Sequence, residues 1–237
     1  MKKSNLKRNV VLSILFFLPV AFLLMLYPAK HNYIPLDVVN KNVAEMDGFI
    51  VEGEQIQFKD HITVLAFLGS QPLDKAIAAS NLKELVYDKF KGFKTFQIVA
   101  VVQQGTEDQV EALKKEINTY EDLRFWHYAY GTEAQIEDLF KSLKTQESLD
   151  DFMSTDHVFI IDKDVYQRGR LDAREAKEIE ANKPLTQLFS YDCIEVAVIK
   201  NKMSEDVRIL FTEYRQKRKG NFDSTSRRAQ DLKDNDE

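Results

Sequence analysis

The chain has 237 residues, 44% of them apolar and 30% charged, which is the balance of a folded domain with a hydrophobic core. Its formal net charge is −5 and its lysines and arginines are interspersed with acids, so the charge pattern argues against a nucleic-acid partner. A single cysteine, Cys193, excludes an internal disulfide, a Cys-x-x-Cys redox pair and a multi-cysteine metal site within one chain.

An uncharged apolar run, Val10–Tyr27, follows four basic residues near the amino end. As a helix it would be about 27 Å long, close to the thickness of the hydrocarbon core of a membrane. The alternative is a cleaved signal peptide, whose apolar region is usually shorter and ends at a small-x-small site. We expect residues 1–9 to be cytoplasmic, residues 10–28 to be a transmembrane signal anchor, and the rest to lie outside the cytoplasm, in a bacterial periplasm.

Three further segments follow the anchor. Residues 29–45 are predicted to be a tether, 46–219 a folded domain, and 220–237, which are polar and charged, a disordered tail. The domain begins with two short apolar runs that flank 52–55, and this pattern predicts a hairpin.

An apolar run at Ile62–Leu68 predicts a buried strand, and Gly-Ser-Gln-Pro after it predicts a loop that leads into a helix from about Lys75 to Phe90. Many α/β folds place their chemistry at such a strand–loop–helix turn. The nearly all-apolar run Phe96–Val102 predicts a central strand covered on both faces.

Two S/T-x-x-E/Q sequences, Thr106–Gln109 and Thr132–Gln135, predict capping boxes that open helices ending near Ile117 and Leu143. A strand is predicted between these helices, over Phe125–Tyr128.

The last part of the domain begins with a strand at Val158–Ile161 and its antiparallel return at Val165–Leu171. Residues 194–198 fit a strand or a helix, and Ser204 is the predicted cap of a closing helix. That helix ends in the basic run Arg215–Lys219, which is either a solvated helix end or a contact for anionic lipid or an acidic partner. The alternation of strands and helices predicts an α/β fold with a mixed sheet.

This order on a membrane anchor is similar to the Sco/SenC family of thioredoxin-like copper proteins. Val64–Gly69 resembles the family's strand before its cysteine loop, and Tyr130–Glu133 resembles the start of a family helix. Thr155–Asp164 resembles the family segment that contains a copper-ligating histidine, and His157 falls on that ligand. The resemblance covers residues 45–215 and implies a thioredoxin-like mixed sheet flanked by helices.

The chain departs from the family at the Cys-x-x-x-Cys motif, where it reads Gly69–Ala76 and has no sulfur. Copper(I) prefers thiolate and thioether ligands, and thiol–disulfide exchange requires a thiolate. We therefore expect no catalytic residue and no cofactor. The resemblance implies a docking face that has lost its metal and retains a relict ligand position, formed by Ser70, Gln71, Pro72, Asp156 and His157.

Two residues have simpler interpretations. His157 fits a hydrogen-bonded residue that holds the loop before a core strand. Cys193 precedes an apolar run and fits a buried structural thiol.

The sequence thus favours a membrane-anchored, non-catalytic Sco-like accessory protein. It would support assembly of a respiratory cytochrome oxidase by binding oxidase subunits or assembly factors. One alternative is a copper-binding protein with rearranged ligands that include His157, with Met153 or carboxylates as the further ligands. A second alternative is a thiol-dependent redox enzyme that uses Cys193.

Overall fold

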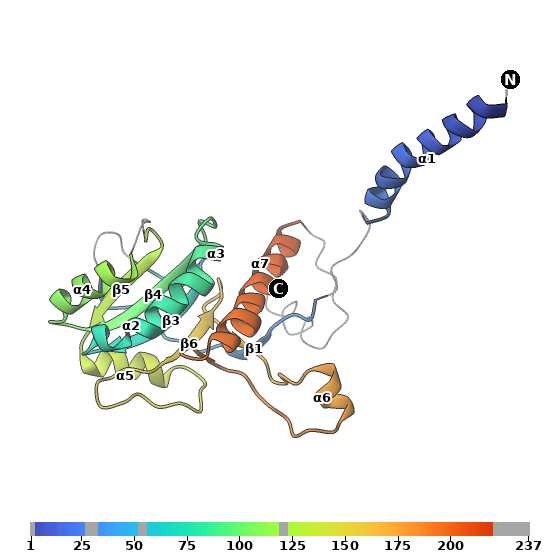
Figure 1. Ribbon diagram of the computed structural model, residues 1–237. Coiled ribbons are helices and arrows are strands. Elements are labelled where there is room, and N and C mark those ends of the chain that lie inside the picture. The colour runs from blue at the N-terminus through green and yellow to red at the C-terminus, as the bar shows by residue number, and fades with distance from the viewer. Residues whose placement is uncertain (1–2, 27–32, 52–55, 119–122, 220–237) are drawn as a thin grey trace. The chain divides into compact units, whose positions relative to one another are not determined.

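The computed structural model describes residues 3–26, 33–51, 56–118 and 123–219 (Figure 1). The chain divides into two units, Met1–Ile34 and Pro35–Glu237.

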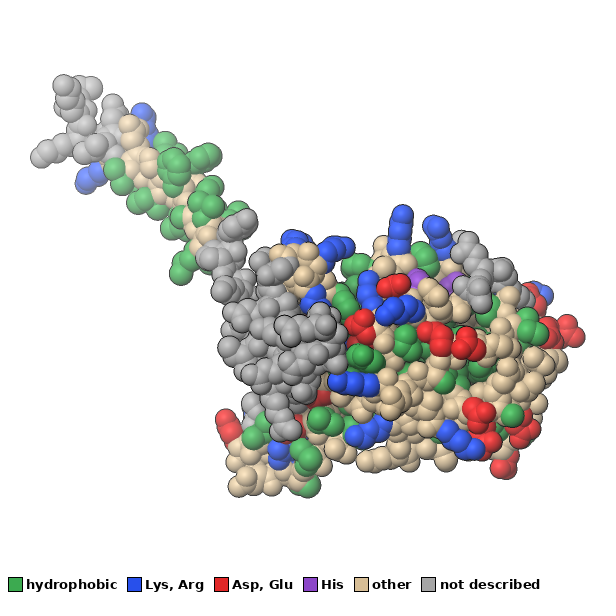
Figure 2. All heavy atoms as spheres, turned by 180° about the vertical axis from the view of Figure 1, so that it is seen from behind, with side chains coloured by type: hydrophobic (Ala, Val, Ile, Leu, Met, Phe, Trp, Pro, Cys, Tyr) green, Lys and Arg blue, Asp and Glu red, His purple; other side chains and the backbone are tan. Residues whose placement is uncertain are grey.

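The described part of the first unit is dominated by the helix α1, Lys3–Leu26. Within it, Lys7–Met25 has a mean hydropathy of 2.1 and none of it is buried. Figure 2 shows the apolar side chains along this helix exposed. The helix is therefore a candidate membrane span by length and composition, criteria that a signal sequence also satisfies.

The second unit is built on a mixed sheet, which has eight strands within the described residues. The path of the sheet is β1-β7-β6-β3-β4-β5-β2, and β8 pairs with β6. Strands β3, β4 and β5 are parallel, and the remaining pairs are antiparallel. The strands are β1 (Asp37–Asn40), β2 (Ile50–Val51), β3 (Ile62–Gly69), β4 (Phe96–Gln103), β5 (Trp126–Gly131), β6 (His157–Ile161), β7 (Gln167–Gly169) and β8 (Tyr191–Asp192).

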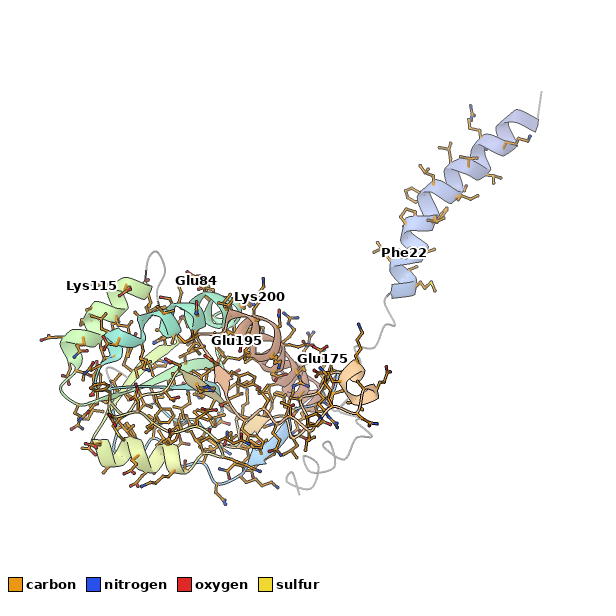
Figure 3. The ribbon with its side chains drawn as sticks, turned by 60° about the horizontal axis from the view of Figure 1, so that its bottom comes forward. Phe22, Glu84, Lys115, Glu175, Glu195 and Lys200 are labelled. Carbon is orange, nitrogen blue, oxygen red and sulfur yellow. The ribbon has the colours of Figure 1, made fainter. Side chains whose placement is uncertain are left out.

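Helices cover both faces of the sheet. Figures 1 and 3 show α2, α3, α4 and α7 on one face and α5 on the other. The helical segments are η1 (Pro72–Lys75), α2 (Ala76–Leu82), η2 (Lys83–Tyr87), α3 (Asp88–Phe90), α4 (Glu107–Ile117), α5 (Glu133–Lys141), α6 (Ala176–Glu180), η3 (Val198–Met203) and α7 (Ser204–Arg218). The predicted fold class, an α/β fold with a mixed sheet flanked by helices and one apolar helix at the amino end, is confirmed.

β3 and β4 lie in the middle of the sheet and are almost completely buried. Every residue of β3 is buried, because helices cover both of its faces. On the α5 side, the ring of Phe67 meets those of Phe140 and Phe159 edge to face, with centroids 5.2 Å and 6.0 Å away.

A buried charge cluster fastens α7 to the sheet. The guanidinium of Arg168 on β7 is 0% exposed. It donates to Asp162 Oδ2 and to Glu213 Oε2, at 2.8 Å in each case, and to the carbonyl of Leu36 at 2.9 Å. Because β7 precedes α7 by about 40 residues, these bonds join segments that are distant in sequence.

Several local predictions are confirmed. The helix after the opening strand runs through Phe90, with a π-helical segment at Lys83–Tyr87. At Thr132 the capping box forms: Thr132 Oγ1 accepts from the backbone of Gln135, and the Gln135 side chain accepts from the backbone of Thr132.

The tether prediction for 29–45 is wrong over its second half. Asp37–Asn40 form β1, which pairs with β7 in the register Asp37↔Gly169. Leu36 beside this strand is 0% exposed. The strand is short and follows a proline, so its pattern along the chain is too weak to reveal a partner that lies about 130 residues away.

The predicted hairpin is also wrong. Ile50–Val51 pair with β5, and residues 56–58 form no strand. The expected turn at 52–55 lies outside the described residues.

Two predicted helix caps do not form. The hydroxyl of Thr106 donates to the carbonyl of Gln103 at 2.7 Å and accepts no bond from its helix. Ser204 lies inside a continuous helical segment that begins at Val196, so residues 196–198 of the ambiguous stretch 194–198 are helical and none of it is a strand. The Ser204 hydroxyl instead donates to the carbonyl of Leu85 at 2.8 Å.

Candidate functional site

The turn after β3 is held against the loop that precedes β6. Gly69 has φ of +65°, and a Cβ at this position would lie 1.9 Å from the carbonyl oxygen of Phe152. The next residue, Ser70, donates its backbone N–H to the same carbonyl at 2.8 Å. Only glycine fits this close approach, so the backbone conformation of the turn depends on Gly69.

His157 is the first residue of β6, and both of its ring nitrogens have partners. Nδ1 lies 3.1 Å from Ser190 Oγ, and Nε2 lies 3.6 Å from a carboxylate oxygen of Glu147. The His157 side chain is 26% exposed. The structure thus supports the hydrogen-bonded interpretation of this residue.

Lys75 is the last residue of η1, directly after the turn that follows β3, and it forms two ion pairs. Its Nζ is 3.2 Å from Asp156 Oδ1 and 3.4 Å from Asp150 Oδ2. Its side chain is 17% exposed. A partly buried cation paired with two carboxylates therefore lies at the turn after β3.

The surroundings of Asp150 favour its ionised form beside this lysine. Burial acts to raise its pKa, but hydrogen bonds from the hydroxyl and backbone of Ser154 and from the backbone of Phe152, together with the charge of Lys75, lower the pKa below its ordinary value. The carboxylate consequently fixes the loop and neutralises the lysine.

A cavity of about 400 Å³ opens at this point, and Lys75, Asp156, His157 and Asp192 are among its lining residues. The structure thus brings together Asp156 and His157, two of the predicted site residues, with Lys75. Three others lie outside the lining of this cavity. Ser70 and Gln71 are partly exposed, and Pro72 is buried, so the Pro72 side chain is not accessible to a partner.

Exposed apolar side chains come from the same three segments that line the cavity. They are Leu73 and Ile77 after β3, Phe152 before β6, and Ile194 and Val196 after β8. Ile77 is the most exposed, at 68%. We call these five residues, with Lys75, Asp150, Asp156 and His157, the cavity face. Apolar groups beside charges are typical of a protein-docking surface.

The donors at the cavity face do not fit copper(I). They are an imidazole and carboxylates, whereas copper(I) prefers sulfur. Among the described residues there is no group of three or more His, Cys, Asp or Glu side chains placed to hold a metal ion. Met153, the thioether nearest in sequence to His157, packs against the hydrophobic core.

Cys193 is buried, as predicted, with 1% of its surface exposed. Burial, followed by the nearby charges of Asp192 and Asp156, raises its pKa far above the ordinary thiol value. A thiol held neutral in this way is a poor nucleophile.

Sequence reasoning missed Lys75, Asp150, Glu147 and Ser190. Lys75 lies in Gly69–Ala76, a segment that the sequence analysis singled out, but the acids that pair with it lie about 75 to 81 residues further along the chain. The paired acids at 150 and 151 were a weak signal within a polar loop.

No family model matches the chain, and no curated protein matches it. Solved structures similar to it include BsSco, a member of the Sco family of cytochrome c oxidase assembly proteins, at 16% identity and a TM-score of 0.46, with 76% of this chain and 98% of that one covered. Arabidopsis thaliana ScoI with copper bound is 14% identical with a TM-score of 0.38, covering 68% of this chain and 97% of that one. The thioredoxin domain of a thiol-disulfide oxidoreductase from Bacteroides vulgatus is 13% identical with a TM-score of 0.32, covering 60% and 94%.

These neighbours include the family that the sequence motifs resemble.

Proposed function

We propose that the chain is a membrane-anchored, non-catalytic accessory protein whose cavity face binds a partner protein. The observation that supports this most is Lys75. In the turn where the resembled family has two thiolates, this chain has a cation paired with two carboxylates, beside exposed apolar side chains. Such a surface offers charge and apolar area to a partner, and its charged groups include no thiolate.

The partner is a component of respiratory cytochrome oxidase assembly, either an oxidase subunit or an assembly factor. This part of the proposal rests on the motifs around Val64–Gly69 and Thr155–Asp164, which resemble the Sco/SenC family.

Affinity purification of the tagged full-length chain from detergent-extracted membranes tests both parts. We expect oxidase subunits or assembly factors to be recovered with the wild type and lost with the variant Ile77→Glu/Ile194→Glu. Ile179→Glu is the matched control, because Ile179 on α6 is also exposed, at 48%. Recovery of neither oxidase subunits nor assembly factors with the wild type would overturn the oxidase part. Equal recovery with both variants would overturn the docking face.

The domain lies outside the cytoplasm in this proposal, with α1 as its anchor. The support is the four basic residues before the apolar run, which favour a cytoplasmic amino end. Protease added to intact spheroplasts should digest the domain. Digestion only after the cells are lysed would contradict this orientation.

A further inference from the structure

A second cavity, of about 480 Å³, lies between the end of α3 and α7, and none of its lining residues belongs to the cavity face. Part of it is an aromatic floor. The rings of Phe93 and Phe211 stack with centroids 4.3 Å apart, and those of Phe90 and Phe211 stack at 5.6 Å. Phe93 is 48% exposed. An apolar ring face is thus open to a ligand at the surface of the domain.

Cations surround this floor. The described residues that line the cavity include no acid and five basic residues, which are Lys163, Arg208, Arg215, Lys217 and Arg218. We call these five with Phe90, Phe93 and Phe211 the aromatic–cationic groove. The guanidinium groups of its three arginines form no ion pair with another described residue.

The dipole of α7 accounts for only part of this charge. Arg215, Lys217 and Arg218 lie in its last turn, where cations are favourable. Arg208 lies earlier in the helix, and Lys163 comes from the turn after β6. Burial lowers the pKa of Lys163, and the charge of Arg218 acts in the same direction, against the nearby carboxylates of Asp60 and Asp164, which raise it. Cations from separate segments therefore converge on one hollow.

We propose that the aromatic–cationic groove binds an acidic peptide segment of a partner protein. An aromatic or large apolar side chain of the peptide stacks on Phe93 and Phe211, and its carboxylates pair with the arginines at the rim. This goes beyond the proposed function, because it assigns a second docking surface formed by other residues.

Charge complementarity selects this occupant. The chain as a whole carries −5, so its overall field repels acidic partners, whereas the lining of this groove carries a local surplus of cations. An anionic membrane surface is the main competitor. Polybasic segments bind lipid headgroups through projecting cations and need no hollow with an aromatic floor. A cavity of this volume is within the range that accommodates an inserted side chain.

The test uses the full-length chain in nanodiscs of zwitterionic lipid. The probe is a fluorescent peptide with a central phenylalanine flanked on each side by three glutamates, and binding is followed by anisotropy. We expect the wild type to bind it. Arg208→Glu/Arg215→Glu should weaken binding by at least about tenfold, because charge-assisted hydrogen bonds are replaced by repulsion. Phe93→Ser should weaken it by about three- to tenfold.

The matched control is Lys115→Glu/Lys141→Glu, which makes the same charge change at exposed positions on α4 and α5 and should bind like the wild type. A peptide with alanine in place of phenylalanine should bind more weakly. Equal binding by the groove variant and the control, or no binding by the wild type, would overturn the proposal. If the Glu variant unfolds, Arg208→Gln/Arg215→Gln provides the same comparison without charge reversal.

Two results would assign a different occupant and overturn the choice of a partner peptide. The first is displacement of the probe by phosphatidylglycerol vesicles but not by phosphatidylcholine vesicles, which would indicate a lipid surface. The second is clearly tighter binding by a chain that ends at residue 219. This result would indicate competition from the chain's own segment Asp231–Glu237, which has four acids and one base.

Discussion

The chain contains two charge clusters that differ in burial. Arg168 and its partners Asp162 and Glu213 are 0–1% exposed, and they join β7 and the turn after β6 to α7. Lys75 and its partners Asp150 and Asp156 are 17–43% exposed and line an open cavity.

The difference separates a structural cluster from a candidate binding cluster. A fully buried cation cannot exchange its carboxylates for water when a partner is lost, so each member depends on the others. An exposed pair contributes about 0–1 kcal/mol and can exchange partners at little cost. We therefore assign the first cluster to stability and the second to recognition.

The largest expected effect is at Arg168. Arg168→Met leaves Asp162 and Glu213 buried without their cation, and it should lower the free energy of unfolding by about 3–5 kcal/mol. Lys75→Met, the matched change in the open cluster, should lower it by no more than about 1 kcal/mol. Chemical denaturation of the full-length chain in detergent provides the measurement. Equal losses in the two variants would remove the distinction between the clusters.

The next effect concerns the turn that supports the open cluster. Gly69→Ala places a methyl group against the carbonyl of Phe152 at a φ of +65°, and should cost about 2–4 kcal/mol in the same assay. Gly92→Ala is the control, because a Cβ there meets nothing within 4 Å. A Gly69→Ala variant as stable as the control would show that the close approach of the two loops is unnecessary.

The contrast between local and distant contacts shows how far the sequence could predict the structure. The strand at 62–68 and the capping box at Thr132 are encoded in neighbouring residues, so their patterns were sufficient. β1 depends on pairing with Gly169, and the position of Ser204 depends on Leu85. Such partners are distant in sequence, and no local pattern identifies them.

The candidate site follows the same rule. His157 was found through a motif, whereas Lys75 acquires its role only when folding brings Asp150 and Asp156 to it. The π-helical segment at Lys83–Tyr87 and the buried Arg168 likewise depend on tertiary packing.

A smaller effect is the pH dependence contributed by Glu213. Burial raises its pKa, and Arg168 does not fully offset this because Asp162 shares the same cation and Glu213 Oε1 has no hydrogen-bond partner. A folded-state pKa above the unfolded value adds stability at low pH, and this stability is lost as the pH rises from about 4.5 through the folded pKa.

Glu213→Gln should remove this pH-dependent contribution to the free energy of unfolding. The stability of the wild type relative to the variant should therefore decrease as the pH rises from about 4 to about 7, by at most about 1.4 kcal/mol per pH unit. Denaturation curves across this range measure the difference. A constant difference, or one that increases with pH, would contradict the assignment.

The smallest expected effects concern the two alternative activities. The Cys193 thiol should not react with a disulfide reagent in the native chain and should react fully in denaturant, because it is 1% exposed and held neutral. Rapid reaction of the Cys193 thiol in the native chain would favour the thiol-dependent alternative.

For copper, titration with Cu(I) should give the same weak affinity for the wild type and for His157→Ala, because His157 offers one nitrogen whose ring is already hydrogen-bonded. A stoichiometric, tight site that His157→Ala abolishes would favour the alternative with rearranged ligands.

The most direct test of the cavity face is site-specific photo-crosslinking in intact cells. A photoreactive amino acid at Ile77, which is 68% exposed, should form an adduct with an oxidase subunit or assembly factor, and the same group at Ile179, 48% exposed, should not. The adduct at 77 should decrease when Lys75→Glu is added. No adduct at 77, or equal adducts at 77 and 179, would contradict a docking role for this surface.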